Sequence, residues 1–500
     1  MPVGRLPSGG DVRTPAEGSG PTTARRRRGD EAHFGSGGVR VFRRCLPTKH
    51  TKHTKQEGGL CDSSAIACSV TNSRSRGGEG EGHGLAELVL PRRSSFDPGV
   101  ASWRLRRENG SVQRPIVILS PLLPPMRGGL ADHTWLLAKH LSATRPVAVL
   151  SSRDVYTNAP FPVRATVHDW EDAGELELEL AATPSDALLV WQYVPHMYGR
   201  GGVNRRLPAL WQKLKREGRK QVMIAHEIAA PWGRMPNQWW YAWNHRRQWN
   251  SILSVADLVP VSTEAWTQEW QAREASSARR LMTLPSPSSI ERVAVGPDHR
   301  VAWRAAQGLA ADAKVLLWWG SVSGPKQLMW VVDAWETACA RLGPVVLCIV
   351  GGNPSVNLPG SLRPLARMMG YLKAEEVSRC LQAADLVALP FSDGASERRT
   401  TLMAALGHGV PVVSTIGHNT GTTLRAADFL SLVPADDADA FVERVTGMLR
   451  DDGARQEMGR RGAARHDAAY SWPVVTGQFT EALDAAGLLT VVPLPRRVGT

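Results

Sequence analysis

A lysine and a pair of arginines in the second half of the chain are the residues best suited to holding an anion. Lys326 closes the glycine-containing loop 320–326, and Arg398 and Arg399 stand in the polar segment 394–401. An ammonium group beside a helix start can neutralise a departing diphosphate, and a guanidinium can clamp a phosphate through two parallel hydrogen bonds. The alternative is that Lys326 is a solvated surface residue and that the arginines only cover a helix. Both interpretations of the arginine pair stay open.

A histidine followed by a glutamate ends an apolar run in the first half. Residues 221–226 read as a buried strand, and His226 stands at its carboxyl end, with Glu227 next to it. Ligands of open α/β sheets bind at the carboxyl ends of strands. A histidine titrates near neutrality and can donate or accept a hydrogen bond. A lone histidine is more often structural, but this placement favours a functional role, in which Glu227 orients the ring.

A glycine loop follows the first predicted strand, at 115–120. It contains Gly128 and Gly129 and leads into a predicted helix whose first turn carries Asp132. Glycines allow backbone amides to approach a ligand closely, and an acidic residue in the first turn complements the helix dipole. A strand, a glycine loop and a helix are the opening of a Rossmann unit. Taken alone, such a loop is better interpreted as a purely structural turn.

Two successive series of strands and helices position these residues. One series runs from residue 115 to 262 and the other from 315 to 414, and a Pro/Ser-rich linker at 284–289 separates them. The predicted fold class is therefore α/β, with two Rossmann-like domains that face an interdomain cleft, preceded by a disordered N-terminal tail. The predicted boundaries are a disordered basic tail at 1–113, a first domain at 114–290, a second domain at 291–470, and a closing helix at 471–485 that returns to the first domain.

Several of these segments resemble the retaining GT-B glycosyltransferases of group 1, which are family 4-like. The resemblance lies in the glycine loop 124–134, the loop 320–326, and the stretch 370–413 with its Gly-Val-Pro-Val-Val ending. Typical members have an arginine five positions before the loop lysine; here Ser321 takes its place. Typical members also have two glutamates eight positions apart; here Ser396 and Ala404 stand there. The chain therefore resembles a divergent branch, in which an Arg-Arg-Thr segment takes over this loop.

The resemblance implies a set of site residues. It makes 114–290 the acceptor-side domain and 291–470 the nucleotide-sugar-binding domain. His226 and Glu397 are the implied catalytic residues, and Gly128, Gly129 and Asp132 form the acceptor-side loop. The implied donor-binding residues are Gly320, Ser321, Lys326, Gly352, Glu397, Arg398, Arg399 and Thr400.

The activity implied by the resemblance is a hexosyl-type transfer from a nucleotide-diphosphate sugar, with retention, to a glycan, a lipid-linked molecule or a small molecule. It implies no cofactor and no metal, a role in polysaccharide or cell-envelope synthesis, and a cytoplasmic location that extends to peripheral contact with the inner face of the membrane. Two alternatives remain: a catalytically weakened sugar-nucleotide-binding protein and a two-Rossmann sugar-nucleotide epimerase. A nicotinamide enzyme is disfavoured, because no strand is followed by GxGxxG with an acidic residue about 20 positions later.

The charge distribution, the cysteine spacing and the length of the apolar runs limit the classes of partner that the chain could bind. Of the net charge of +13, +8 lies in residues 1–113, so the excess of basic residues does not mark a nucleic-acid-binding domain. The six cysteines show no CxxC spacing, which argues against a metal or disulfide framework and favours a reducing compartment. No apolar run approaches the roughly 20 residues of a membrane span.

One tryptophan-rich span lies at 232–249, interleaved with Arg246 and Arg247. An aromatic and basic helix can lie at a membrane interface, which would suit a lipid-linked acceptor. Packing in the core or between domains is the more common role of such tryptophans, and it is the interpretation we favour from sequence. The tryptophans concerned are Trp232, Trp239, Trp240, Trp243 and Trp249.

Overall fold

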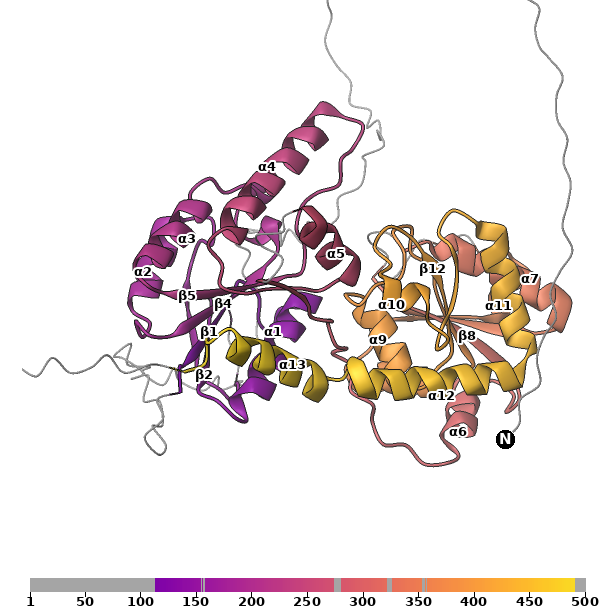
Figure 1. The fold of residues 1–500 in the computed structure, drawn as a ribbon. Coiled ribbons are helices and arrows are strands. Elements are labelled where there is room, and N and C mark those ends of the chain that lie inside the picture. Colours follow the sequence, from indigo (N-terminus) through magenta and orange to yellow (C-terminus); the bar gives the residue numbers. More distant parts are fainter. Residues whose placement is uncertain are drawn as a thin grey trace, which may run out of the picture. The chain divides into compact units, whose positions relative to one another are not determined.

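A computed structural model describes residues 113–153, 155, 158–273, 280–321, 326–352, 356 and 358–490. The tail predicted over 1–113 lies outside the described residues except for Gln113, and so do residues 322–325 of the loop that precedes Lys326. The described residues belong to one structural unit, which spans Cys61–Thr500. Two parallel β-sheets with flanking helices make up this part of the chain (Figure 1).

The first sheet has seven strands in the order β3-β2-β1-β4-β5-β6-β7, and every pairing is parallel. Its central strands are buried along their whole length, as continuous apolar runs predict for a sheet that is covered on both faces. The strands are β1 (Ile116–Ser120), β2 (Val147–Ser152), β3 (Val163–Val167), β4 (Leu188–Tyr193), β5 (Lys220–Ala225), β6 (Val259–Val261) and β7 (Leu281–Thr283).

Helices cover both faces of this sheet. Because successive side chains of a strand point to opposite faces, Ile116 and Ile118 pack in one apolar cluster while Val117 and Leu119 pack in another. The helices are α1 (Gly129–Ser142), α2 (Ala173–Ala181), α3 (Leu207–Arg216), α4 (Pro236–Leu253) and α5 (Glu264–Arg273), with the short 3₁₀ turns η1 (Pro195–Met197) and η2 (Arg200–Gly202).

The second sheet has six parallel strands in the order β10-β9-β8-β11-β12-β13. A single large apolar cluster runs through its strands and the helices packed on them. The strands are β8 (Lys314–Gly320), β9 (Val345–Gly351), β10 (Ala366–Gly370), β11 (Leu386–Leu389), β12 (Val412–Ile416) and β13 (Ser431–Pro434).

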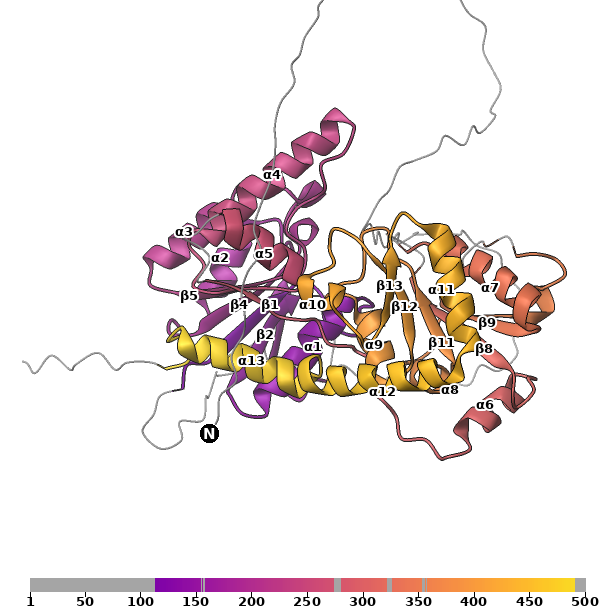
Figure 2. The same cartoon turned by 45° about the vertical axis from the view of Figure 1, so that its right-hand side comes forward.

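The helices around the second sheet end with one that packs on the first sheet. Trp472, Val475 and Phe479 of α13 lie in the same apolar cluster as Ile116 of β1, and Figure 2 shows α13 continuing beyond α12. The indole of Trp472 also donates to the carbonyl of Ser288 at 2.8 Å. The elements are α6 (His299–Ala306), α7 (Leu328–Leu342), η4 (Arg363–Leu365), α8 (Ala374–Ala383), α9 (Thr400–Gly407), α10 (Thr422–Arg425), α11 (Ala438–Arg450), α12 (Asp452–Ala469) and α13 (Trp472–Ala485).

Each sheet has one point at which its strand order reverses. It lies between β1 and β4 in the first sheet and between β8 and β11 in the second. Ligands of doubly wound sheets bind outside the carboxyl ends of the strands at such a point. The two parallel sheets, each with a reversal, confirm the predicted pair of Rossmann-like folds.

The packing interpretation of the tryptophan-rich span is wrong for four of its five tryptophans. Trp249, near the end of α4, is fully buried, but Trp239 and Trp243 are 56% and 52% exposed, and Trp232 and Trp240 are exposed to a similar degree. The reason is that only the second half of α4 packs against the sheet. Among the described residues, no helix combines the length and the apolar character needed to cross a bilayer.

Candidate functional site

Lys326 lies beside the end of β8. Its Nζ occupies the space next to Gly320, where a Cβ atom on that glycine would come within 1.9 Å of it, and the glycine has a φ of +122°. Removal from water, followed by repulsion from Arg399, lowers the pKa of Lys326 to about 8. The same Cβ would lie 3.2 Å from the Thr401 side chain in the first turn of α9. The ammonium group is therefore held where β8 ends and α9 begins.

Arg398 and Arg399 share a single carboxylate, that of Asp393. Arg399 donates to it in a close contact, and Arg398 donates to it at 3.2 Å. The side chain of Asn419 donates to the same carboxylate at 2.8 Å. Burial, followed by repulsion from Arg398, lowers the pKa of Arg399 to about 10. Asp393 therefore holds the pair in place but offsets only one of its two charges.

The arginine pair also keeps unused hydrogen-bonding capacity. The Nε atoms of Arg398 and Arg399 are buried and have no hydrogen-bond partner among the residues that the structure describes. Arg399 stacks over the ring of Phe391 at 4.5 Å, and Arg398 stacks over Trp266 of the first sheet's α5 at 4.9 Å. Together with Lys326 the region holds three cations, and among the described residues the only carboxylate that pairs directly with any of them is that of Asp393. The region therefore has the charge and the free donors to receive an anion.

Glu397 points toward the first sheet. One carboxylate oxygen accepts from the backbone amide of Glu264 at 3.2 Å, and the backbone carbonyl of Glu397 accepts from Ser286 in the linker at 3.1 Å. The side chain is buried, and its other oxygen has no partner among the described residues. Burial raises the pKa of Glu397 to about 7, against the opposing effect of its backbone hydrogen bonds. Near neutrality this carboxyl group therefore populates both protonation states.

His226 lies at the end of β5, as the sequence predicts. Its Nε2 pairs with the side-chain oxygen of Gln192 at 2.5 Å, and because an amide oxygen only accepts, Nε2 carries the proton. The ring of the buried His133 packs edge-on against it at 4.6 Å between centroids. Burial, followed by the charges of His133 and Arg398, lowers the pKa of His226 well below its usual value. At neutral pH the ring is uncharged, and Nδ1 is left as an acceptor.

Sequence reasoning did not select Gln192 or His133 as site residues. Gln192 is the last residue but one of β4 and pairs with His226, and its own side-chain nitrogen is buried without a partner among the described residues. A usable signal was the position of Gln192 at the carboxyl end of a central strand, since that is where ligands bind.

The structure brings the predicted groups of the two sheets within electrostatic reach of each other. Arg398 of the second sheet lowers the pKa of His226 in the first, and Glu227 acts on Arg399 in the direction opposite to burial. A hydrogen bond also joins Trp266 of α5 to Asn419 at 2.8 Å. His226 and the arginine pair are thus neighbours in space, although about 170 residues separate them in sequence.

The remaining candidates lie at the ends of strands and the starts of helices. Gly128 precedes α1 with a positive φ, and Asp132 in its first turn is hydrogen-bonded to Ser289, while burial raises the pKa of Asp132. Ser321 follows β8 directly and Gly352 follows β9, and both are exposed. Thr400 is the first residue of α9.

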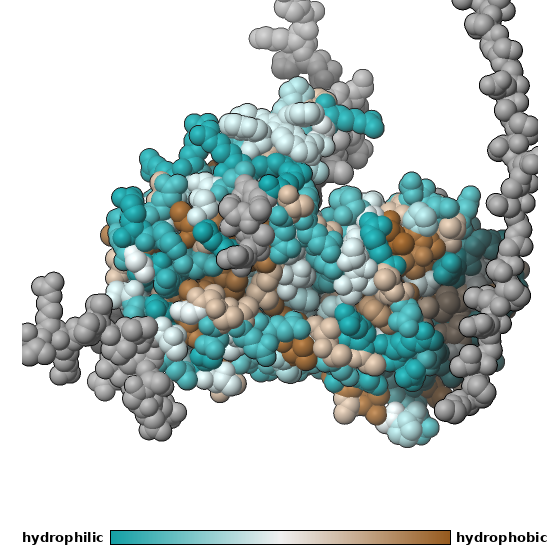
Figure 3. Space-filling model, in the orientation of Figure 1, coloured by the Kyte–Doolittle hydropathy of each residue, from teal (hydrophilic) through white to brown (hydrophobic). Residues whose placement is uncertain are grey.

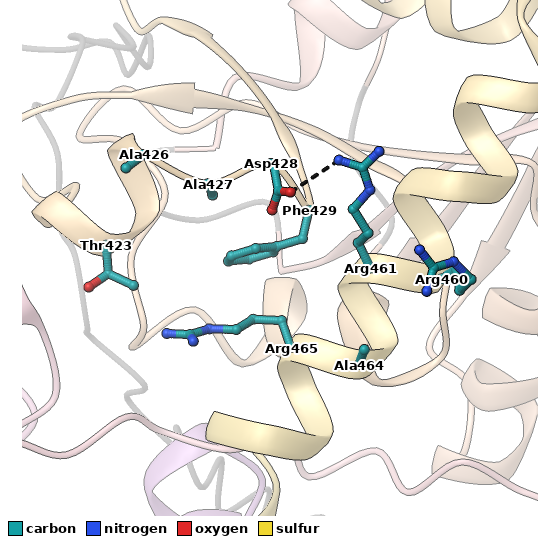
Figure 4. A pocket seen from close by; sticks show the side chains of 9 residues that line it. All are labelled: Thr423, Ala426, Ala427, Asp428, Phe429, Arg460, Arg461, Ala464 and Arg465. Atoms are coloured by element: carbon teal, nitrogen blue, oxygen red, sulfur yellow. Dashed lines mark hydrogen bonds and ion pairs between the residues drawn. The ribbon is translucent and has the colours of Figure 1, made fainter. Parts of the chain in front are cut away.

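Two hollows in the second half are not lined by any of these candidates. One, of about 500 Å³, lies between α12 and the segment that joins α10 to β13 (Figure 4). Its Arg461 is paired with Asp428 at 3.1 Å and Arg460 is paired with Glu457, so these two charges are already compensated. The other, of about 700 Å³, lies by the amino ends of the strands, where Arg455 is bonded to helix carbonyls. Neither hollow replaces the cationic site as the candidate.

Parts of the chain are similar to known proteins. Residues 313–451 match the family described as glycosyl transferases group 1. A D-inositol 3-phosphate glycosyltransferase of Mycolicibacterium paratuberculosis is 27% identical over 246 residues, which are 45% of this chain and 52% of that protein. A phosphatidyl-myo-inositol mannosyltransferase of Mycolicibacterium smegmatis is 28% identical over 188 residues, which are 36% of this chain and 48% of that protein. The chain spans about half the length of these curated relatives.

A solved structure extends the likeness to both sheets. The Anabaena protein HepE, in complex with UDP and glucose, superposes on this chain with a TM-score of 0.54 at 14% identity. The match covers 74% of this chain and 100% of that chain. At this identity the likeness shows the fold alone, and it confirms the predicted arrangement of two Rossmann-like folds.

Proposed function

We propose that this chain, whose residues 313–451 match the glycosyl transferases group 1 family, moves a sugar from a nucleoside diphosphate sugar to an acceptor. The observation that carries the proposal is the cationic site at the carboxyl ends of β8 and β11: Arg398 and Arg399 share the carboxylate of Asp393, and Lys326 lies within electrostatic reach of Arg399. Buried cations with unpaired donors suit a diphosphate, whose charge grows as it leaves.

The proposed reaction breaks the bond between the anomeric carbon of the donor and a diphosphate oxygen. An acceptor oxygen forms the new bond to that carbon, with retention of configuration, and loses its proton. Lys326 and the arginine pair stabilise the departing diphosphate in the role that a metal ion plays elsewhere. Gly320, Ser321, Gly352 and Thr400 line the same donor side in this proposal, at strand ends and at the start of α9.

His226 and Glu397 are the proposed catalytic residues. The neutral His226 presents Nδ1 as an acceptor for a hydroxyl of the donor sugar, while Gln192 fixes its tautomer. Glu397 has a pKa of about 7, which suits proton transfer near neutrality. In this proposal the loop with Gly128, Gly129 and Asp132 receives the acceptor.

For the acceptor and the location we propose a lipid-linked, glycan or small polyol acceptor at the inner face of a membrane. Support comes from the two relatives, of which one is named for phosphatidyl-myo-inositol and the other for D-inositol 3-phosphate. The group 1 match supports transfer over epimerisation. We propose the domain boundaries 114–290, 291–470 and 471–485 as units of this function.

Thermal shift with UDP and GDP tests the cationic site. A nucleotide at 100 times its Kd stabilises the fold by about 2.7 kcal/mol. Lys326→Ala removes a charged hydrogen-bond donor worth about 2–3 kcal/mol, so it should weaken binding roughly 30- to 150-fold and cut the stabilisation to less than about 1 kcal/mol. The matched control is Lys314→Ala, because Lys314 begins the strand after which Lys326 lies and its ammonium pairs with Asp452.

Equal losses in the two lysine variants, or an unchanged shift in Lys326→Ala, would end the assignment of the donor site. Arg398→Lys should keep the charge but lose the planar fork, and should therefore weaken binding less than Lys326→Ala. Transfer and retention are tested separately, by NMR of the products formed from a labelled donor.

A further inference from the structure

The first half of α4 and the loop before it carry an exposed aromatic and basic surface. We call residues 232–247 the aromatic arm. Figures 1 and 2 both show one end of α4 projecting away from the first sheet. Five aromatic side chains are exposed on it, together with Met235: Trp232, Trp239, Trp240, Tyr241 and Trp243. Contiguous exposed aromatic surface on a folded protein marks a place of interaction.

The aromatic arm is built by specific contacts. The indole of Trp239 donates to the carbonyl of Gly233 at 2.7 Å, and Trp232 packs against Trp239 at 5.0 Å between ring centroids. Arg246 ties the loop to the helix through the carbonyls of Ala230 and Ala242. These contacts hold the tryptophans outward while the following half of α4 packs on the sheet.

Charge decides which partner this surface fits. No acidic residue occurs between Glu227 and Asp257, whereas Arg234, Arg246 and Arg247 lie within or at the end of the aromatic arm. Arg246 stacks on Trp232 at 4.5 Å and Arg247 on Trp243 at 5.4 Å, so cations and indoles lie at the same level. A second copy of the same surface would meet it with like charges. A partner that carries many negative charges side by side would complement the arginines and also contact the exposed aromatic rings.

The aromatic arm is intermediate in polarity: it is too polar to enter the hydrocarbon core of a bilayer, but it is less polar than the protein surface around it. Figure 3 shows the projecting end of α4 as mostly pale, between the teal of polar residues and the brown of apolar ones. Tryptophan and tyrosine prefer the headgroup level of a bilayer, where a flat ring is half-solvated and its polar tip stays wet. Arginines at this depth keep their guanidinium groups beside the phosphates.

We propose that the aromatic arm docks on the anionic headgroups of a lipid bilayer, with Trp240 and Trp243 inserted at the interface and Arg234 and Arg247 paired with lipid phosphates. The inference deepens the proposed function and rests on it for the location of the acceptor. In this proposal the peripheral membrane contact is made by the aromatic arm, which belongs to the helices that cover the first sheet. Docking there would bring a lipid-linked acceptor to the protein without any membrane-spanning segment.

Vesicle partitioning of the full chain tests the proposal, with phosphatidylglycerol-rich and pure phosphatidylcholine vesicles as probes. The parent should bind the anionic vesicles more tightly. Trp240→Ser combined with Trp243→Ser should lower the partition coefficient at least roughly tenfold, because two half-exposed indoles no longer leave water. Arg234→Gln combined with Arg247→Gln should lower it roughly 25-fold at low salt and less at high salt.

A matched control removes exposed apolar side chains elsewhere. Leu178→Ser combined with Met329→Ser changes residues that are 75% and 49% exposed on α2 and α7, and it should leave the partition coefficient unchanged. Because all the substituted side chains are exposed, circular dichroism should show parent-like folds. If the Trp240/Trp243 variant binds vesicles as the parent does, another surface holds the membrane and the proposal is wrong.

Two further results would overturn it. The parent could bind soluble oligosaccharide through the tryptophans and ignore vesicles, or the variants could change the mass measured by sedimentation equilibrium rather than lipid binding. Failure of the donor site is distinguishable from failure here. The tryptophan variant should keep the thermal shift with UDP or GDP, and Lys326→Ala should keep its binding to vesicles.

Discussion

Replacing Glu397 by glutamine removes an ionisable group that the structure buries where the two sheets meet. The carboxyl group of Glu397 accepts a hydrogen bond from the amide of Glu264, the first residue of α5. Only 3% of the residue is exposed. Burial raises the pKa of this group from 4.5 to about 7, so the folded chain keeps the proton over a pH range in which the unfolded chain has lost it.

Taken by itself, this shift lowers the stability of the fold as the pH rises. Because the pKa is raised in the folded state, the contribution is fully present below pH 4.5 and is lost as the pH rises through about 7. A pKa difference of about 2.5 units at about 1.4 kcal/mol per unit gives about 3 kcal/mol. Glutamine keeps the shape and cannot ionise, so Glu397→Gln should lack this pH dependence.

The assay is urea unfolding of the parent and of Glu397→Gln at pH 5 and at pH 8. Fluorescence and circular dichroism are both followed, since a chain with two sheets need not unfold in one step. Buried histidines titrate in both proteins and cancel in the comparison. The parent should lose about 2.5 kcal/mol relative to the variant between the two pH values, and Glu375→Gln, at an exposed position, should behave as the parent. Parallel pH profiles for the parent and the Glu397 variant would refute the reasoning.

Three other substitutions have outcomes that the geometry fixes. Gly320→Ala places a methyl group on the Nζ of Lys326 at a positive φ, so it should cost about 1–3 kcal/mol in thermal unfolding and abolish the shift with UDP or GDP. Asp393→Asn leaves two buried guanidinium groups without their counter-charge and should destabilise the fold by about 3–5 kcal/mol in urea unfolding. Gln192→Leu removes the acceptor of His226, which should cost about 1–3 kcal/mol and lower the rate of sugar transfer in the product assay; a parent-like rate would remove Gln192 from the site.

Local sequence was sufficient for the central strands. Residues 115–120, 315–320 and 345–350 predict buried strands, and the structure has β1, β8 and β9 there. A continuous apolar run can be satisfied only by burial on both faces, so neighbours are not needed to interpret it. Strands β2, β3, β7, β10 and β13 were not predicted; β3 and β10 are only partly buried and carry Arg164 and Arg367, whereas β2 is buried and was missed all the same.

The candidate site was predicted by residue type but not by arrangement. Lys326, Arg398 and Arg399 could be chosen from sequence because cations near glycine loops suit phosphates. Their common partner Asp393 lies only five and six positions before them, but the orientation of Glu397 toward α5 depends on how distant segments pack. No spacing within one segment encodes a contact that spans more than a hundred residues.

Sequence by itself determined that the chain forms two series of parallel strands and helices, with glycines and cations after the strands, because strand burial and turn geometry are local properties. Tertiary structure alone decided which side chains meet. Trp239 and Trp249 stand ten positions apart in one helix, yet the first is 56% exposed and the second is fully buried. The physical reason is that the helical period is the same along the whole of α4, so it does not show how far the helix is covered. Burial stops where the neighbouring sheet ends, and only the tertiary structure places that point.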